Sequence, residues 1–198
     1  MIKVLNKTKP KAKTKTVSPV GDPSIYLDPA TYKRARQLMR ARGIGYLCGN
    51  AIVNPKTSKN LKEGWNTLLL HLAPASLSGF NTCPFSTAGC REACLNEAGQ
   101  GAIVVDGVNR CGVARIARTR FFFEHPNEFL SVIHRQITNA KKGDLPLAVR
   151  LNGTSDIPWE EVAPDLFEVH NDVAFYDYSK TFTRLGKTPS NYVLTYSY

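Results

Sequence analysis

The sequence predicts an α/β domain built around a parallel sheet, in the form of a partial or open (β/α) barrel. Apolar residues make up 42% of the 198-residue chain, enough to form a substantial core. Short apolar runs typical of buried strands alternate with segments of helical periodicity through the last third of the chain, as in βαβ units. Four strands can be identified, whereas a closed (β/α)₈ barrel needs about eight strands and roughly 250 residues. No run of about eighteen apolar residues occurs, so no membrane-spanning segment is expected.

Residues 1–24 are expected to form a disordered basic tail ahead of a single domain that spans 25–198. Residues 1–16 contain six lysines and no acidic residue, so they carry most of the net charge of +10. A segment of this composition cannot bury enough apolar surface to fold. It either binds nucleic acid loosely through its charge or only keeps the chain soluble. No apolar stretch of the kind found in secretory signals follows the lysines, so the cytoplasm is the expected location.

The first helix of the domain is predicted from its end signals. Asp28 is a typical N-cap residue, Pro29 suits the first helical turn, and Gly43 suits a helix stop. The next segment, 49–62, is interpreted as a short apolar stretch followed by a polar loop. The run 65–74 (WNTLLLHLAP) is continuous and apolar, as expected for a strand buried on both faces.

The later elements alternate between helix and strand. Helical periodicity predicts helices over 112–123 and 126–143. Strands are expected over 147–156, 173–180 and 191–198, with a mostly helical segment over 159–172 and a short helix or loop over 181–190. The last strand would leave an open sheet edge. The domain is therefore expected to be either an open sheet whose edge is covered, or a version of a longer barrel truncated at the C-terminus.

Three of the five cysteines cluster with the spacing C-x6-C-x3-C, at Cys83, Cys90 and Cys94. An odd total and a reducing cytoplasm argue against a disulfide framework, and thiolates are ligands that zinc and iron–sulfur clusters prefer. Cys90 and Cys94 would share one helix face, and Cys83 would fold back through a turn at the end of the first buried strand. Cys111 is the candidate fourth ligand and His71 a weaker one; without either, a cluster with one open iron fits best. The alternative is that the cysteines are small buried hydrophobic residues.

Polar residues follow two of the predicted strands. Asn152 and Asp156 come after one strand, and Asp177 and Lys180 lie at the end of the next. Because parallel strands end at the same edge of a sheet, these four side chains are the candidate catalytic residues. The alternative is a structural network in which Arg150 pairs with Asp156 or Asp177.

Two arginines of the predicted helix 112–123 are the candidate cofactor-binding residues. Arg115 and Arg118 lie three positions apart and so share a helix face, where a phosphate or an anionic cofactor could bind.

Several motifs resemble, in the same order, the bacteriophage gene product 88 family. They are NTCPFSTAGCREACLNEAGQG, RIARTRFFFEHPNEFL, AVRLNGTSDIPWE, FYDYSK and NYVLTYS. The similarity runs from about Trp65 to the C-terminal end. It implies a phage-encoded protein of the host cytoplasm, from a family without an assigned activity whose members usually continue past the point where this sequence ends.

A looser resemblance is to radical S-adenosylmethionine enzymes. These enzymes hold an iron–sulfur cluster with three cysteines after the first strand of a partial (β/α) barrel, usually spaced C-x3-C-x2-C. The resemblance implies an iron–sulfur cluster, with S-adenosylmethionine as a further cofactor.

Two functional hypotheses follow. The first is an iron–sulfur enzyme of the radical type that acts on a nucleotide or a nucleic-acid related substrate. The second is a non-enzymatic phage accessory protein that binds nucleic acid through its basic tail and contains a structural zinc site. An open metal position and a pocket near Asn152, Asp156, Asp177 and Lys180 would favour the first hypothesis.

Overall fold

The computed structural model describes residues 22–52, 54–94 and 102–197 of the chain. Residues 1–21, which include all the lysines of the expected tail, lie outside the described residues. Residues 22–24 do not continue that tail as expected, because Asp22 caps a short helix, α1 (Pro23–Tyr26), and the side chain of Tyr26 is buried. Residues 23 and 24, which were expected to belong to the tail, thus lie in a helix.

Five strands of the described chain form one mixed sheet in the order β1-β2-β3-β4-β5. They are β1 (Cys48–Gly49), β2 (Asn66–Leu70), β3 (Leu147–Arg150), β4 (Ala174–Ser179) and β5 (Tyr192–Tyr196). Strands β2 to β5 are parallel, and β1 pairs antiparallel with β2. The predicted α/β class with a parallel sheet is confirmed. The sheet is not closed into a barrel, because β1 and β5 each pair with a single described strand.

Eight α-helices lie in the described residues. Besides α1 they are α2 (Pro29–Ala41), α3 (Pro55–Lys62), α4 (Ala88–Glu92), α5 (Arg110–Glu124), α6 (Pro126–Ala140), α7 (Trp159–Val162) and α8 (Pro164–Val169), with a 3₁₀ turn, η3 (Phe182–Arg184). Helix α2 has the predicted ends: Asp28 accepts a hydrogen bond from the Thr31 N–H, and Gly43 follows with φ of +65°. None of these helices is long and apolar enough to span a bilayer.

The prediction of a polar loop before β2 is wrong, because α3 occupies most of that segment. Helix α3 carries little helical periodicity in its sequence, since Leu61 is its only large apolar residue and that side chain is exposed. Tertiary contacts hold the helix in place. Thr57 is buried, and the Asn60 amide donates a hydrogen bond to the Thr67 hydroxyl of β2 at 3.0 Å.

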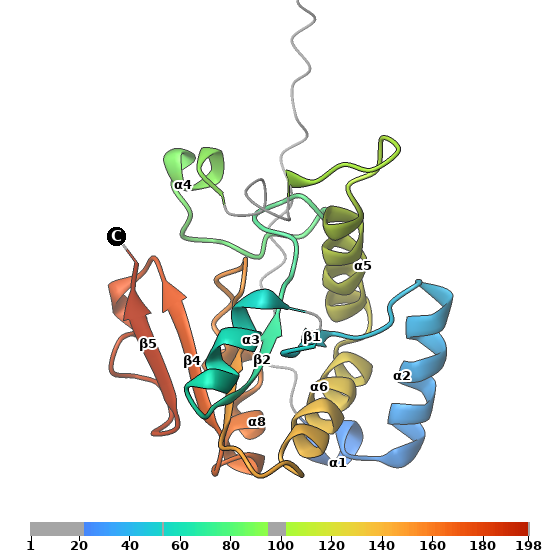
Figure 1. Ribbon diagram of the computed structural model, residues 1–198, viewed down its shortest axis with the longest axis vertical. Coiled ribbons are helices and arrows are strands. Elements are labelled where there is room, and N and C mark those ends of the chain that lie inside the picture. Colours follow the sequence, from blue (N-terminus) through green and yellow to red (C-terminus); the bar gives the residue numbers. More distant parts are fainter. Residues whose placement is uncertain (1–21, 53, 95–101, 198) are drawn as a thin grey trace, which may run out of the picture.

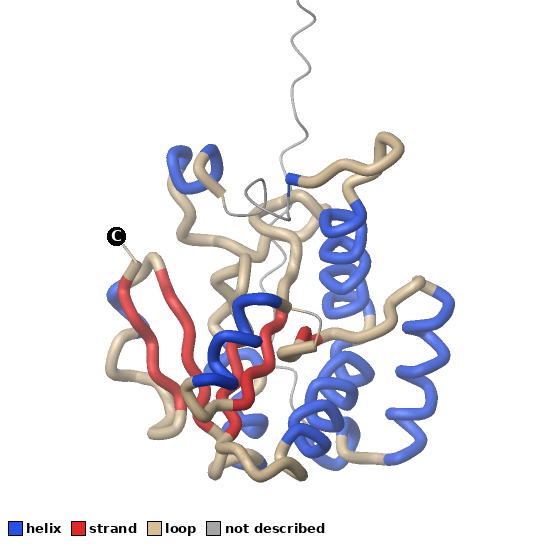
Figure 2. The backbone as a smooth tube through the Cα atoms, in the orientation of Figure 1, coloured by secondary structure: helices blue, strands red, loops and turns tan. Residues whose placement is uncertain are grey.

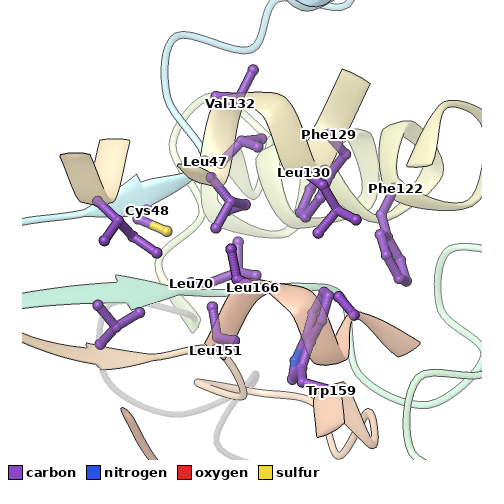
Figure 3. Close-up of a cluster of buried hydrophobic side chains, with 14 of the residues drawn as sticks. Leu47, Cys48, Leu70, Phe122, Phe129, Leu130, Val132, Leu151, Trp159 and Leu166 are labelled. Carbon is purple, nitrogen blue, oxygen red and sulfur yellow. The ribbon is translucent and has the colours of Figure 1, made fainter. Parts of the chain in front are cut away.

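The main core lies between one face of the sheet and the long helices. In Figure 1, α2, α5 and α6 stand together on the right of the sheet, while α3 lies in front of β2. Alternate strand residues face this core, including Leu68 and Leu70 of β2 and Val149 of β3. Figure 3 shows Leu70 of β2 between the side chains above it, such as Leu47 and Leu130, and Leu151 below. Cys48 also belongs to this core, with 3% of its surface exposed.

The sheet positions the candidate site at one end of the molecule. The parallel strands β2 to β5 have their carboxyl ends on the same side, and α4 lies above that edge at the top of Figure 1. Figure 2 shows that loops, not strands or long helices, make up most of this end. Parallel α/β proteins bind ligands at the corresponding edge.

Candidate functional site

A pocket of about 710 Å³ opens at the carboxyl ends of the parallel strands. One wall comes from the loop after β2, which contributes residues of 74–77 and of the cysteine segment 83–94. The opposite wall comes from the turn after β3, residues 150 and 152–156, and from the ends of β4 and β5. Segments that lie far apart in the chain therefore meet here because their strands are parallel neighbours.

All three clustered cysteines line this pocket. Cys83, Cys90 and Cys94 are half-buried, and none is in a disulfide. The Ala75 N–H donates a hydrogen bond to the Cys83 Sγ at 3.3 Å, and the buried Thr82 hydroxyl donates to the Ala73 carbonyl oxygen at 2.6 Å. These bonds fold the segment back onto the end of β2, as predicted for Cys83. Burial raises the pKa of the Cys83 thiol, although the bond from Ala75 acts the other way.

The predicted helical relationship between Cys90 and Cys94 is wrong. Thr87 caps α4 by accepting a hydrogen bond from the Cys90 N–H, but the helix ends at Glu92. Cys94 therefore lies beyond the last helical turn. The helix is short because it has no buried residue to stabilise further turns.

The structure does not bring the predicted metal ligands into a coordination sphere. Within the described ranges, no three His, Cys, Asp or Glu side chains are close enough to hold a metal ion. Cys111, the predicted fourth ligand, is exposed in the first turn of α5 and does not line the pocket. His71, the weaker candidate, is also outside the lining. Metal binding therefore stays a prediction, while the grouping of three thiols on one pocket wall is observed.

The turn after β3 is built around the buried amide of Asn152. Its Oδ1 accepts hydrogen bonds from the Ser155 hydroxyl, the Ile157 N–H and the Trp159 indole N–H, at 2.9, 3.0 and 3.2 Å. Its Nδ2 donates to the Ile157 carbonyl oxygen at 2.9 Å. Asn152 lines the pocket as predicted, but these bonds use its side chain to shape the turn.

Asp156 lines the pocket from a buried position and pairs with an arginine that the sequence analysis did not single out. Arg184 lies 2.6 Å from Asp156 and 2.6 Å from Glu160. Although burial disfavours its charged form, the bonds to Glu160 and the charge of Asp156 raise the pKa of Arg184. The Lys180 N–H also donates to Asp156, at 3.0 Å, so this carboxylate connects three segments. Arg184 lies in a short 3₁₀ turn, where no periodic pattern marks a buried position.

Asp177 is buried beneath the pocket and does not line it. Strand alternation places it on the same face as Phe175, with 1% of its surface exposed. Its carboxylate accepts hydrogen bonds from the Asn152 N–H at 2.8 Å and the Tyr192 hydroxyl at 3.1 Å. Burial raises its pKa to about 7, against the opposing effects of the Asn152 N–H and the Arg150 charge. The predicted position at the mouth of the sheet is therefore wrong for this residue, and a catalytic role for it is untested.

Two basic residues at strand ends lie on the pocket wall opposite the cysteines. Lys180 was predicted there, and it lines the pocket. Arg150, the last residue of β3, also lines it, with its guanidinium 4.8 Å from the Tyr178 ring centre and its Nε 3.7 Å from Asp177. The expected pairing with Asp177 is thus present. In the sequence, the feature that marks Arg150 as a site residue is its charge at the end of an otherwise apolar strand.

The two arginines predicted to bind a cofactor lie outside the pocket lining. Arg118 donates a hydrogen bond to the Tyr46 carbonyl oxygen at 2.9 Å and lies over the Tyr46 ring. It therefore holds the loop between α2 and β1. Arg115 is half-buried, and burial lowers its pKa, while the nearby thiols of Cys111 and Cys94 act to raise it. Neither arginine lines the described pocket, and cofactor binding by Arg115 and Arg118 stays a prediction.

The chain was compared with protein families, curated proteins and solved structures. A family model described as gene product 88 matches residues 47–198, which is well over half of the chain. The match covers all five strands of the sheet and every pocket-lining residue. No curated protein and no solved structure matches the chain. The resemblance to radical S-adenosylmethionine enzymes has no support from these comparisons.

Proposed function

The chain belongs to the gene product 88 family, and we propose that it is a phage-encoded iron–sulfur protein whose cluster is bound by Cys83, Cys90 and Cys94. One observation carries the proposal: all three clustered thiols lie on one wall of an open pocket at the carboxyl ends of the parallel strands. Three thiolates hold a cluster while one iron remains available to a ligand.

The donor set fits this group. The three cysteines are free thiols of one short segment, and soft thiolate ligands select iron–sulfur clusters or zinc. Binding requires α4 and its flanking residues to draw the thiols together. Helix α4 buries none of its residues, so its movement would disrupt little of the core.

The rest of the pocket supports an enzyme with a small substrate. A bound cluster would supply electron transfer and an open iron position. The opposite wall presents the polar residues Asn152, Asp156 and Lys180, of which the first two are held in place by buried hydrogen bonds. A nucleotide-related substrate, with S-adenosylmethionine as a further cofactor, fits a pocket of this size.

The second candidate is a structural zinc site in a non-enzymatic accessory protein that binds nucleic acid through the basic tail. It is supported by the three free thiols on the pocket wall, because thiolate ligands also select zinc. Cys111 could then complete a closed set of four ligands.

Metal analysis of the anaerobically purified chain tests both candidates. The iron–sulfur proposal expects iron and acid-labile sulfide in the wild type, and their loss in Cys83→Ser, Cys90→Ser and Cys94→Ser. Cys48→Ala is the matched control, because its thiol lies in the core on β1, and it should retain the metal. One zinc per chain that is lost in Cys111→Ser would establish the second candidate instead. A metal-free wild type would refute both.

A further inference from the structure

We propose that the pocket binds an anionic ligand, with Arg150 holding its phosphate or carboxylate group on the wall opposite the cysteines. The inference rests on the proposed function in one respect, since it names the substrate class of the same pocket. The evidence for it is the charges and hydrogen bonds of the pocket lining.

The charged side chains that line the pocket are mostly basic. Arg91, Arg150 and Lys180 contribute positive charge, and Asp156 is the single acidic residue of the lining. The Asp156 carboxylate is already compensated by Arg184 at 2.6 Å. Asp177 lies 3.7 Å from the Arg150 Nε, but it is buried beneath the lining, as is Glu160 beside Arg184. The walls of the described pocket themselves therefore carry more cationic than anionic groups, which favours an anion.

Four hydroxyl groups of the lining already donate their protons within the described chain, so they are poor candidates for binding an anion. Ser86 donates its proton to the Cys83 carbonyl oxygen, Thr154 to the Leu72 carbonyl oxygen, Ser155 to Asn152, and Ser179 to Asp156. An oxyanion accepts hydrogen bonds, so it needs donors that remain available. The guanidinium groups of the lining, those of Arg91 and Arg150, meet that need.

Arg150 is the best placed of these groups. Its Nε is buried and has no hydrogen-bond partner within the described part of the chain. The Tyr178 ring, 4.8 Å away, and Asp177, 3.7 Å away, hold the guanidinium in position before a ligand arrives. A planar guanidinium binds carboxylate or phosphate through two parallel hydrogen bonds, and a pre-positioned one loses less entropy on binding.

Calorimetric titration of the anaerobically purified full-length chain tests this inference. The probes are inorganic phosphate, AMP, succinate and, without a negative charge, adenosine. We expect AMP to bind at least tenfold more tightly than adenosine, and Arg150→Gln to weaken anion binding at least tenfold. Arg150→Lys should recover part of the affinity, because it keeps the charge but loses the paired hydrogen bonds.

Arg135→Gln is the matched control, since Arg135 also lies over a tyrosine ring, that of Tyr32, at 5.0 Å on the far helix α6. It should leave anion binding unchanged. Binding by phosphate and AMP alone would identify a phosphate ligand, and binding by succinate alone a carboxylate ligand. Equal anion affinity in the wild type and Arg150→Gln, binding of AMP and adenosine with the same measurable affinity, or no binding of any anion would overturn the inference. Iron content measured on the same variants separates this result from the cluster proposal, because Arg150→Gln should retain the metal.

Discussion

Gly153 lies directly against the carbonyl oxygen of Leu70. Its N–H donates a hydrogen bond to that oxygen at 2.9 Å, and a Cβ at position 153 would stand 2.6 Å from it. The contact joins the turn after β3 to the end of β2. It therefore positions the two walls of the pocket relative to each other.

The first prediction concerns this contact. Gly153→Ala should lower the free energy of unfolding by about 1–3 kcal/mol, because the added methyl group forces two backbone segments apart. Urea unfolding followed by circular dichroism measures the change. Gly143→Ala is the matched control, since its added Cβ would lie 3.8 Å from the nearest atom, the Ala140 carbonyl oxygen. Equal stability of the two variants would contradict the prediction.

The second prediction concerns the buried pair of Arg184 and Asp156. Arg184→Met should reduce the free energy of unfolding by about 3–5 kcal/mol, because it leaves the Asp156 and Glu160 carboxylates without their cation. Lys141→Met breaks the exposed pair with Asp172 and should cost less than about 1 kcal/mol. Chemical denaturation of both variants provides the comparison. A small effect of Arg184→Met would show that the network is not required for stability.

The third prediction concerns the pH dependence of stability that arises from a histidine pair, His134 in α6 and His170 after α8. His134 Nδ1 lies 3.0 Å from His170 Nε2, and burial, with the charges of His134 and Lys141, lowers the pKa of His170 to about 4. The unfolded chain, whose histidines titrate near 6.5, therefore binds more protons between these two values. Stability should fall as the pH decreases from about 6.5 towards 4, and it should be insensitive to this group above 6.5.

Unfolding experiments across that range, with His170→Gln as the comparison, isolate the effect. The difference in stability between wild type and variant should shrink as the pH falls. Asp177 contributes in the opposite direction, because its raised pKa favours the folded state at low pH, but that contribution is common to both proteins. A constant difference would rule out the titration of His170.

The fourth prediction concerns the hydrogen bond from Tyr192 to Asp177. Burial raises the pKa of Asp177 to about 7, so the carboxyl group is ionised at pH 8.5 and protonated at pH 5. Tyr192→Phe removes a donor that stabilises the ionised form, at 3.1 Å. The substitution should lower the free energy of unfolding by about 1.5–3 kcal/mol at pH 8.5. The loss should be smaller at pH 5, because the Asp177 carboxyl group is then neutral. Equal losses at the two pH values would indicate that Asp177 does not titrate in this range.

Helices and strands were predicted well where the signal is local, such as a capping residue at a helix end or a continuous apolar run. The N-cap at Asp28 and the glycine stop at Gly43 predicted the ends of α2, and the apolar run before the cysteines predicted β2. The same approach missed α3 and β1. Helix α3 has almost no apolar periodicity, and β1 is a two-residue strand that exists because it pairs with β2.

The candidate site shows the same division. The clustering of Cys83, Cys90 and Cys94 is visible in the sequence, and the parallel-sheet pattern placed these cysteines near Asn152 and Lys180, where the pocket forms. The sequence could not show that Asp177 faces away from the pocket. Side chains of β4 alternate between the two faces of the sheet, and which face is buried depends on the elements packed against it.

The sequence by itself determined the α/β class, the positions of the parallel strands along the chain and the cysteine segment that follows the first of them. These features follow from periodicity, caps and spacing, which depend on residues close together in the chain. Only the tertiary structure decided which side chains form the pocket wall and which form its support. Arg150 gained a place on the wall, and Asp156 was joined to Arg184, because contacts between residues far apart in the chain are set by the packing of whole elements.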